Sequence, residues 1–66
     1  MQFFIEDLSC QHCAGVITRT VAGVDPVARL HIDIPAKTVQ IHTAASPSVM
    51  AAALNAAGYP AVLQQD

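Results

Sequence analysis

Apolar and polar side chains alternate along the middle of this chain. Residues 27–34 (VARLHIDI) place an apolar side chain at every second position, and residues 38–43 (TVQIHT) repeat the alternation. A period of two is typical of strands with one buried and one wet face. Because a short turn around Pro35–Lys37 separates the segments, they are predicted to pair as an antiparallel hairpin.

A second period, of three to four residues, begins after the first ten positions. It is typical of a helix with one apolar stripe, and the stripe comprises Ala14, Ile17, Val21 and Val24. We expect this helix to run from about Cys13 to Ala22. The breakers Gly23 and Pro26 then end it.

Another helix is expected to begin at Ser46–Pro47, with Ser46 as the N-cap and Pro47 as the first helical residue. Gly58 stands where a left-handed C-terminal cap is wanted. The side chains expected to be buried by this helix are Val49, Met50, Ala53, Leu54 and Ala57.

Two outer strands complete the predicted order βαββαβ. Residues 2–7 (QFFIED) are rich in aromatic and β-branched side chains, and residues 59–64 form a last strand that Pro60 marks as an edge. Two helices with single apolar stripes can cover one face of a four-stranded antiparallel sheet. We therefore predict an α+β, ferredoxin-like sandwich in which residues 1–66 form one domain.

Composition narrows the possible functions. The chain has 66 residues, a net charge of −2 and only 12% charged residues. Without a cluster of Lys or Arg, nucleic acid and anionic membranes are unexpected partners, and so small a domain has little room for an enclosed substrate cavity. No signal peptide or membrane-spanning run stands out, so we expect a cytoplasmic, free-standing protein with reduced thiols.

The candidate chemistry lies in Cys10-Gln11-His12-Cys13, a C-x-x-C between the first strand and the first helix. Cys13 falls in the first helical turn, where free N–H groups favour a thiolate, and Cys10 should be the more exposed sulfur. Structural zinc sites want four ligands and iron–sulfur clusters usually four cysteines. Two thiolates suit a soft ion such as Cu(I), because low coordination satisfies it.

Other interpretations of the two cysteines remain open. Dithiol redox proteins also use C-x-x-C, although nothing here matches the aromatic-Cys-Gly-Pro-Cys pattern usual there. A structural disulfide closing so short a loop would contribute only about 2 kcal/mol. Two inert core cysteines are the remaining possibility.

At Leu8-Ser9-Cys10-Gln11-His12-Cys13 the sequence resembles the heavy-metal-associated domain family, and specifically its bacterial copper chaperones. The resemblance covers essentially the whole chain, including the VDPV turn and the AAGYPA ending. It implies a binding protein, not an enzyme, that carries Cu(I) on Cys10 and Cys13. Its implied partners are a copper-exporting P-type ATPase, reached by thiolate exchange, and a copper-responsive regulator.

The resemblance also assigns roles to residues near the Cys10–Cys13 segment, which is called the metal loop below. Tyr59 matches the tyrosine that these chaperones place beside the loop, and Leu8 stands where the family usually has Met. Leu conserves the apolar volume beneath the loop, but its presence leaves a mercury- or zinc-binding role open. An unsaturated two-sulfur site could also join two copies through one ion.

Three histidines could add to the chemistry. His12 could donate a hydrogen bond to a thiolate, act as a third ligand, or lie in solvent outside the coordination sphere. His31 and His42 are expected on the wet sheet face, and they would be direct neighbours if Ile32 pairs with Ile41. Such a pair would suggest a weak second site for Cu²⁺ or Zn²⁺.

Overall fold

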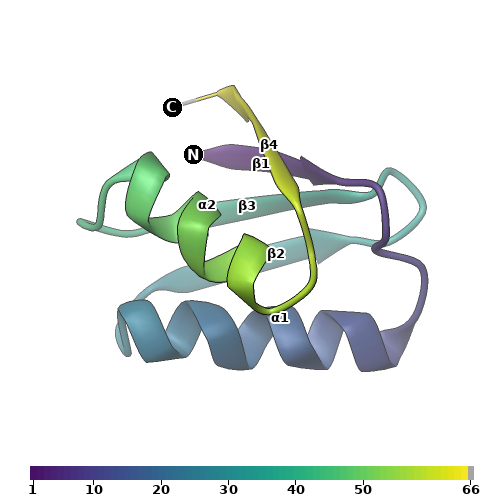
Figure 1. Cartoon of the computed structure of the whole chain (residues 1–66), viewed down its shortest axis with the longest axis horizontal. Helices are drawn as coiled ribbons and strands as arrows, with labels where there is room; N and C mark the ends of the chain where they lie inside the picture. Colours follow the sequence, from purple (N-terminus) through teal and green to yellow (C-terminus); the bar gives the residue numbers. More distant parts are fainter. Residues whose placement is uncertain (66) are drawn as a thin grey trace.

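The computed structural model describes residues 1–65 and has the predicted element order (Figure 1). The elements are β1 (Gln2–Ile5), α1 (Gln11–Val24), β2 (Arg29–Asp33), β3 (Thr38–His42), α2 (Pro47–Ala56) and β4 (Ala61–Gln65). All strand pairs are antiparallel, and the sheet order is β2-β3-β1-β4. This is the ferredoxin-like arrangement, with β4 at an edge directly after Pro60, as predicted. The predicted domain's last residue, Asp66, lies outside the described range.

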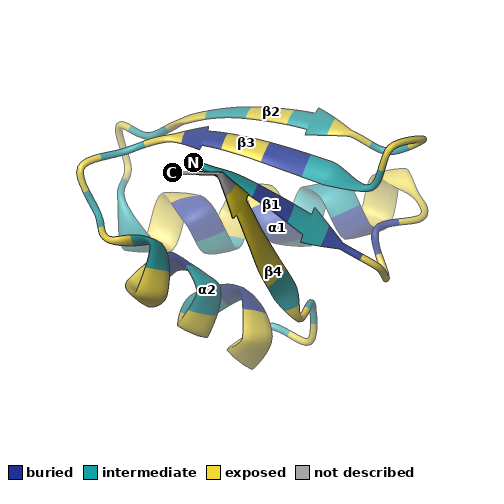
Figure 2. Ribbon diagram, turned by 90° about the horizontal axis from the view of Figure 1, so that it is seen from above, coloured by how far each residue is buried: buried dark blue, intermediate teal, exposed yellow. Residues whose placement is uncertain are grey.

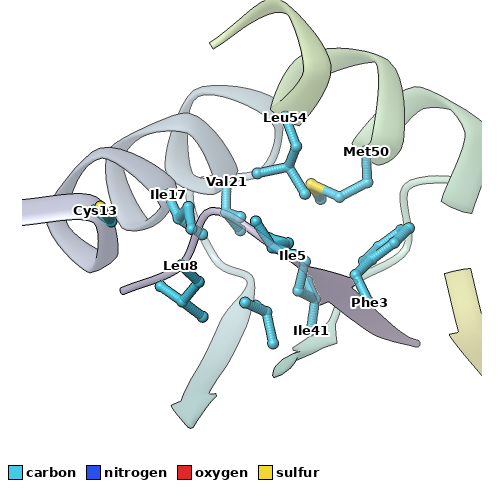
Figure 3. Packing of buried hydrophobic residues seen from close by; sticks show 10 residues of the cluster. Phe3, Ile5, Leu8, Cys13, Ile17, Val21, Ile41, Met50 and Leu54 are labelled. Carbon is cyan, nitrogen blue, oxygen red and sulfur yellow. The ribbon is translucent and has the colours of Figure 1, made fainter. Parts of the chain in front are cut away.

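Both helices lie on the same side of the sheet, as Figure 2 shows. The hydrophobic core fills the space between the two layers, where Met50 and Leu54 of α2 face Ile5 (Figure 3). Its fully buried members are Phe3, Ile5, Leu8, Ile17, Val39, Ile41, Met50 and Leu54. None of the helices described is long and apolar enough to cross a membrane.

The first strand and the first helix differ from their predicted limits. β1 ends at Ile5, two residues early, because the Leu8 N–H donates to the Ile5 carbonyl at 3.0 Å and turns the chain at Glu6 and Asp7. α1 begins at Gln11, two residues before the predicted start, and continues to Val24. Gln11 and His12, which were predicted to lie in a loop before the helix, therefore belong to α1.

The second helix has the predicted caps but buries fewer side chains. The Val49 N–H donates to the Ser46 hydroxyl at 3.2 Å, and Gly58 has a φ of 92°. Met50 and Leu54 are fully buried, whereas the prediction for Val49 was wrong, since 52% of its surface is exposed. Val49 lies one position ahead of Met50, on the side of α2 that turns away from the sheet.

The hairpin register corrects the prediction that His31 and His42 are direct neighbours. Ile32 pairs with Val39, not with Ile41, so His31 faces Gln40 and His42 faces Arg29. The two imidazoles are diagonal neighbours and not a direct pair. An Arg opposite His42 also disfavours a bound cation, so the geometric basis of a second metal site is lost.

Asp25 joins the end of α1 to the loop before α2. Its carboxylate accepts from the Thr43 hydroxyl at 2.5 Å and from the Val27 N–H at 3.1 Å. The Thr43 hydroxyl in turn accepts from the Ala45 N–H at 3.1 Å. The bond from Thr43, followed by that from Val27, holds the pKa of Asp25 below its ordinary value of 3.8.

Replacement of Leu54 by Ala should lower the free energy of unfolding by about 2–5 kcal/mol, because it removes a fully buried side chain and leaves a cavity. The total free energy of unfolding of a 66-residue domain is only about 3–10 kcal/mol. Val49→Ala on the same helix is the control and should change stability by no more than about 0.5 kcal/mol. Equal losses in urea unfolding of the two variants would contradict this packing.

The Asp25 contacts predict an acid-sensitive stability. A carboxyl whose pKa is depressed in the folded state stabilises the fold above its unfolded pKa, near 3.8, and this contribution disappears as pH falls through the lower folded value. Asp25→Asn should therefore be less stable than the wild type at neutral pH, with the difference shrinking in acid. Thr43→Val should show the same trend in urea unfolding, and a pH-independent difference would contradict it.

Candidate metal centre

The two cysteines lie at the beginning of α1, and they differ in backbone position and in burial. Cys10 is the N-cap residue, exposed and extended, and its side chain makes no capping hydrogen bond. Cys13 is the third helical residue and only 8% exposed. It begins the buried stripe that continues through Ile17 and Val21 (Figure 3). Thus one sulfur is held by core packing, and the other is exposed.

The two sulfur atoms converge. Cys10 Sγ and Cys13 Sγ are 3.1 Å apart, and both residues are free thiols. Two sulfurs on opposite sides of one ion would lie about 4.6 Å apart with bonds of about 2.3 Å, the length in zinc thiolates. Binding therefore requires a modest outward movement, and the exposed Cys10 side chain is the one able to make it.

Hydrogen bonds make Cys13 unusually acidic. The Tyr59 hydroxyl has the largest effect and the Cys10 thiol the next, followed by the Ser9 backbone N–H; together they lower the Cys13 pKa from 9.0 to about 6, against an opposing effect of burial. Its place in the first turn of α1 also favours the anion, because the helix N-terminus is electropositive. The lowered pKa favours the thiolate of Cys13, which is the form that binds metal.

Tyr59 is the predicted tyrosine beside the loop, and it lies half-buried against the core. Hydrogen bonding with Cys13 raises the pKa of Tyr59, because loss of the hydroxyl proton would remove this interaction; burial and the nearby Cys13, Cys10 and Asp7 charges act in the same direction. Tyr59 therefore packs against the core and also lowers the pKa of Cys13.

Leu8 and His12 occupy opposite environments. Leu8 is fully buried beneath the loop, where Figure 3 places it next to α1. This position agrees with a packing role for the apolar residue before the C-x-x-C. His12 is exposed as the second residue of α1, and its side chain makes no hydrogen bond to residues 1–65. The solvated alternative for His12 thus matches its position.

Among residues 1–65, no further metal-ligating side chains gather around the sulfur pair. Within the part of the chain that the structure describes, no group of three or more His, Cys, Asp or Glu side chains could hold a metal ion. The arrangement offers two sulfurs and an accessible side at Cys10. Such a donor set fits a soft, low-coordinate ion and leaves room for an incoming ligand.

Ser9 is a contributor that sequence reasoning missed. Its backbone N–H and, to a smaller extent, its hydroxyl lower the pKa of Cys13. A polar residue directly before a C-x-x-C could have drawn attention to it, since such residues often supply hydrogen bonds at helix starts.

Titration of the reduced, metal-free protein tests the site electrostatics. The ultraviolet absorbance of thiolate should show a first proton lost with a pKa of about 6. Tyr59→Phe should raise this value, because the hydroxyl that stabilises the anion is gone. Cys13→Ser, as control, should abolish the low transition. A wild-type protein that forms thiolate only near pH 9 would contradict the geometry.

Comparison with known proteins places the chain in a family. The family model described as the heavy-metal-associated domain matches residues 2–60. A search among curated proteins gives no significant match.

Several solved structures share the fold closely. A gold binding protein is 36% identical with a TM-score of 0.90, covering 92% of this chain and 94% of its own. The copper chaperone Atx1 from Synechocystis PCC6803 is 27% identical with a TM-score of 0.90 and coverages of 94% and 98%. Atu1203 from Agrobacterium tumefaciens is 35% identical with a TM-score of 0.83 and coverages of 91% and 94%. With the family model matching nearly its full length, this chain belongs to the heavy-metal-associated domain family.

Proposed function

We propose that this protein is a cytoplasmic carrier of Cu(I), which it binds through Cys10 and Cys13 and passes to the metal-binding domain of a copper-exporting P-type ATPase. The observation that carries the proposal is the sulfur pair, 3.1 Å apart, with one member buried and one exposed. Cu(I) is satisfied by two or three sulfur ligands. The likeness to the copper chaperone from Synechocystis PCC6803 supports this choice of cargo.

The asymmetry of the two ligands suits transfer. Cys13 is held in the core, and its lowered pKa favours the thiolate that would retain the ion. Cys10 is exposed and lacks a capping bond. One thiolate of the partner can add to the ion as a third ligand, after which Cys10 leaves, and a second thiolate of the partner then replaces Cys13. Apart from the proton that each thiol loses on binding the ion and regains on leaving it, only metal–sulfur bonds are made and broken, so the exchange needs no enzymatic catalysis.

The same two-sulfur site could interact with other partners and bind other ions. A copper-responsive regulator could accept the ion by the same exchange, and a second copy of this chain could share it through its own sulfur pair. Another soft ion is the second candidate cargo, since one structural neighbour is a gold binding protein. Mercury shares this preference for thiolates, whereas zinc would require ligands from a partner.

Anaerobic titration with Cu(I) in the presence of a chromophoric chelator tests the proposal. The wild type should outcompete the chelator and bind about one ion per chain. Cys10→Ser and Cys13→Ser should each weaken binding by more than about 100-fold, since even an outer contact to a metal ligand contributes about 10–100-fold. His12→Ala is the matched control within the loop and should bind as the wild type does.

Three results, from this titration and from parallel assays on the same protein, would contradict or change the proposal. A wild type that loses to the chelator but reduces disulfides catalytically is a dithiol oxidoreductase. Preferential retention of mercury or zinc over Cu(I) would identify the alternative cargo. Elution of the Cu(I)-loaded protein at twice the apo mass would show an ion shared between two copies. Transfer to an isolated ATPase domain can then be followed directly.

A further inference from the structure

Lys37 lies far from the cysteines in sequence but at the same end of the molecule. It belongs to the turn between β2 and β3, which Figure 1 shows beside the segment that leads from β1 into α1. Its φ is 58°, a left-handed conformation that residues other than glycine adopt infrequently. Its N–H donates to the Ile34 carbonyl at 3.0 Å and closes the turn. The backbone of Lys37 is thus held firmly.

Two hydrogen bonds connect Lys37 to the segment before the metal loop. The Ile5 N–H donates to the Lys37 carbonyl at 2.8 Å. The Lys37 ammonium Nζ donates to the backbone carbonyl of Glu6 at 3.0 Å. The first bond joins the last residue of β1 to the residue before β3, and so extends the pairing of these strands by one position. The second uses a charged donor, and charge-assisted bonds are about twice as strong as neutral ones.

The Glu6 carbonyl belongs to the central peptide of a tight turn. The Leu8 N–H donates to the Ile5 carbonyl at 3.0 Å, so residues 5–8 form a β-turn with Glu6 and Asp7 at its centre. The peptide between the two central residues points in opposite directions in type I and type II turns. An ammonium bound to the Glu6 oxygen therefore favours one orientation of this peptide over the other.

The orientation of the turn directs the chain into the metal loop. Leu8 is fully buried directly after the turn, and Ser9 and Cys10 come next. We propose that Lys37 is a positioning residue for the metal loop: its ammonium holds the Glu6 carbonyl, and so fixes the turn that presents Cys10 beside Cys13. The inference rests on the proposed function for its metal-binding readout alone, because the position of the loop can be measured without metal.

The experiment compares Lys37→Met with Lys37→Arg. Met and Arg are both unbranched and have the same conformational cost at the positive φ of residue 37, but only Arg retains a charged hydrogen-bond donor. Arg29→Met removes an equal charge from an exposed position at the other end of β2 and is the control for net charge. All three variants are compared with the wild type at equal folded fraction, verified by thermal unfolding.

Two measurements are made on each variant. In metal-free protein, amide NMR should show shifts at Leu8, Ser9 and Cys10 for Lys37→Met, with wild-type positions for Arg29→Met and restoration by Lys37→Arg. In Cu(I) competition, Lys37→Met should bind about threefold to tenfold more weakly, because a smaller fraction of molecules has the competent loop. A loss of global stability alone would move neither readout in the folded protein.

The possible outcomes separate this inference from the proposed function. Amide shifts confined to the vicinity of residue 37, together with unchanged Cu(I) affinity, would overturn the positioning role. So would a failure of Lys37→Arg to restore either readout. If the wild type does not bind Cu(I), the proposed function fails, while the amide shifts at Leu8 to Cys10 still decide whether Lys37 orders the loop.

Discussion

The packing of Cys13 into the hydrophobic core is the constraint on which the rest of the site depends. Because Cys13 shares a buried stripe with Ile17 and Val21, the forces that hold α1 on the sheet also fix one sulfur in space. The Tyr59 hydroxyl and the Cys10 thiol then favour its anionic form. Cys10, outside the first helical turn, has no such anchor. In the proposed function, this unequal pair supplies one buried and one exposed ligand, and the exposed one is accessible to a partner.

Much of the fold could be predicted because it depends on local patterns. Alternation indicated the β2–β3 hairpin, Ser46 and Gly58 bounded α2, and Pro60 indicated an edge. The failures concern choices that periodicity does not determine. Val49 and Met50 are both apolar, and the approach of α2 to the sheet decides which is buried. A slip of the hairpin register likewise changes the partners of His31 and His42 without changing the pattern of either strand.

The candidate site was predictable to a different degree. The C-x-x-C and its place before a helix are visible in the sequence, and so is the apolar Leu8. The burial of Cys13 was not predicted, because an apolar stripe that begins at Ala14 leaves the cysteine out. The place of Ser9 before the C-x-x-C was a visible signal, but its effect on Cys13 was not, and the Lys37 ammonium contacts a backbone carbonyl 31 positions away. Contacts of this kind appear only when the chain is folded.

The first coordination shell of the bound ion tests the account most directly. X-ray absorption at the copper edge, recorded on anaerobically loaded protein, distinguishes sulfur neighbours from nitrogen and oxygen. Coordination by Cys10 and Cys13 predicts a shell of sulfur alone, with two sulfurs per ion in the monomer and no imidazole. A shell dominated by nitrogen or oxygen, or a shell unchanged by the loss of Cys13, would contradict it.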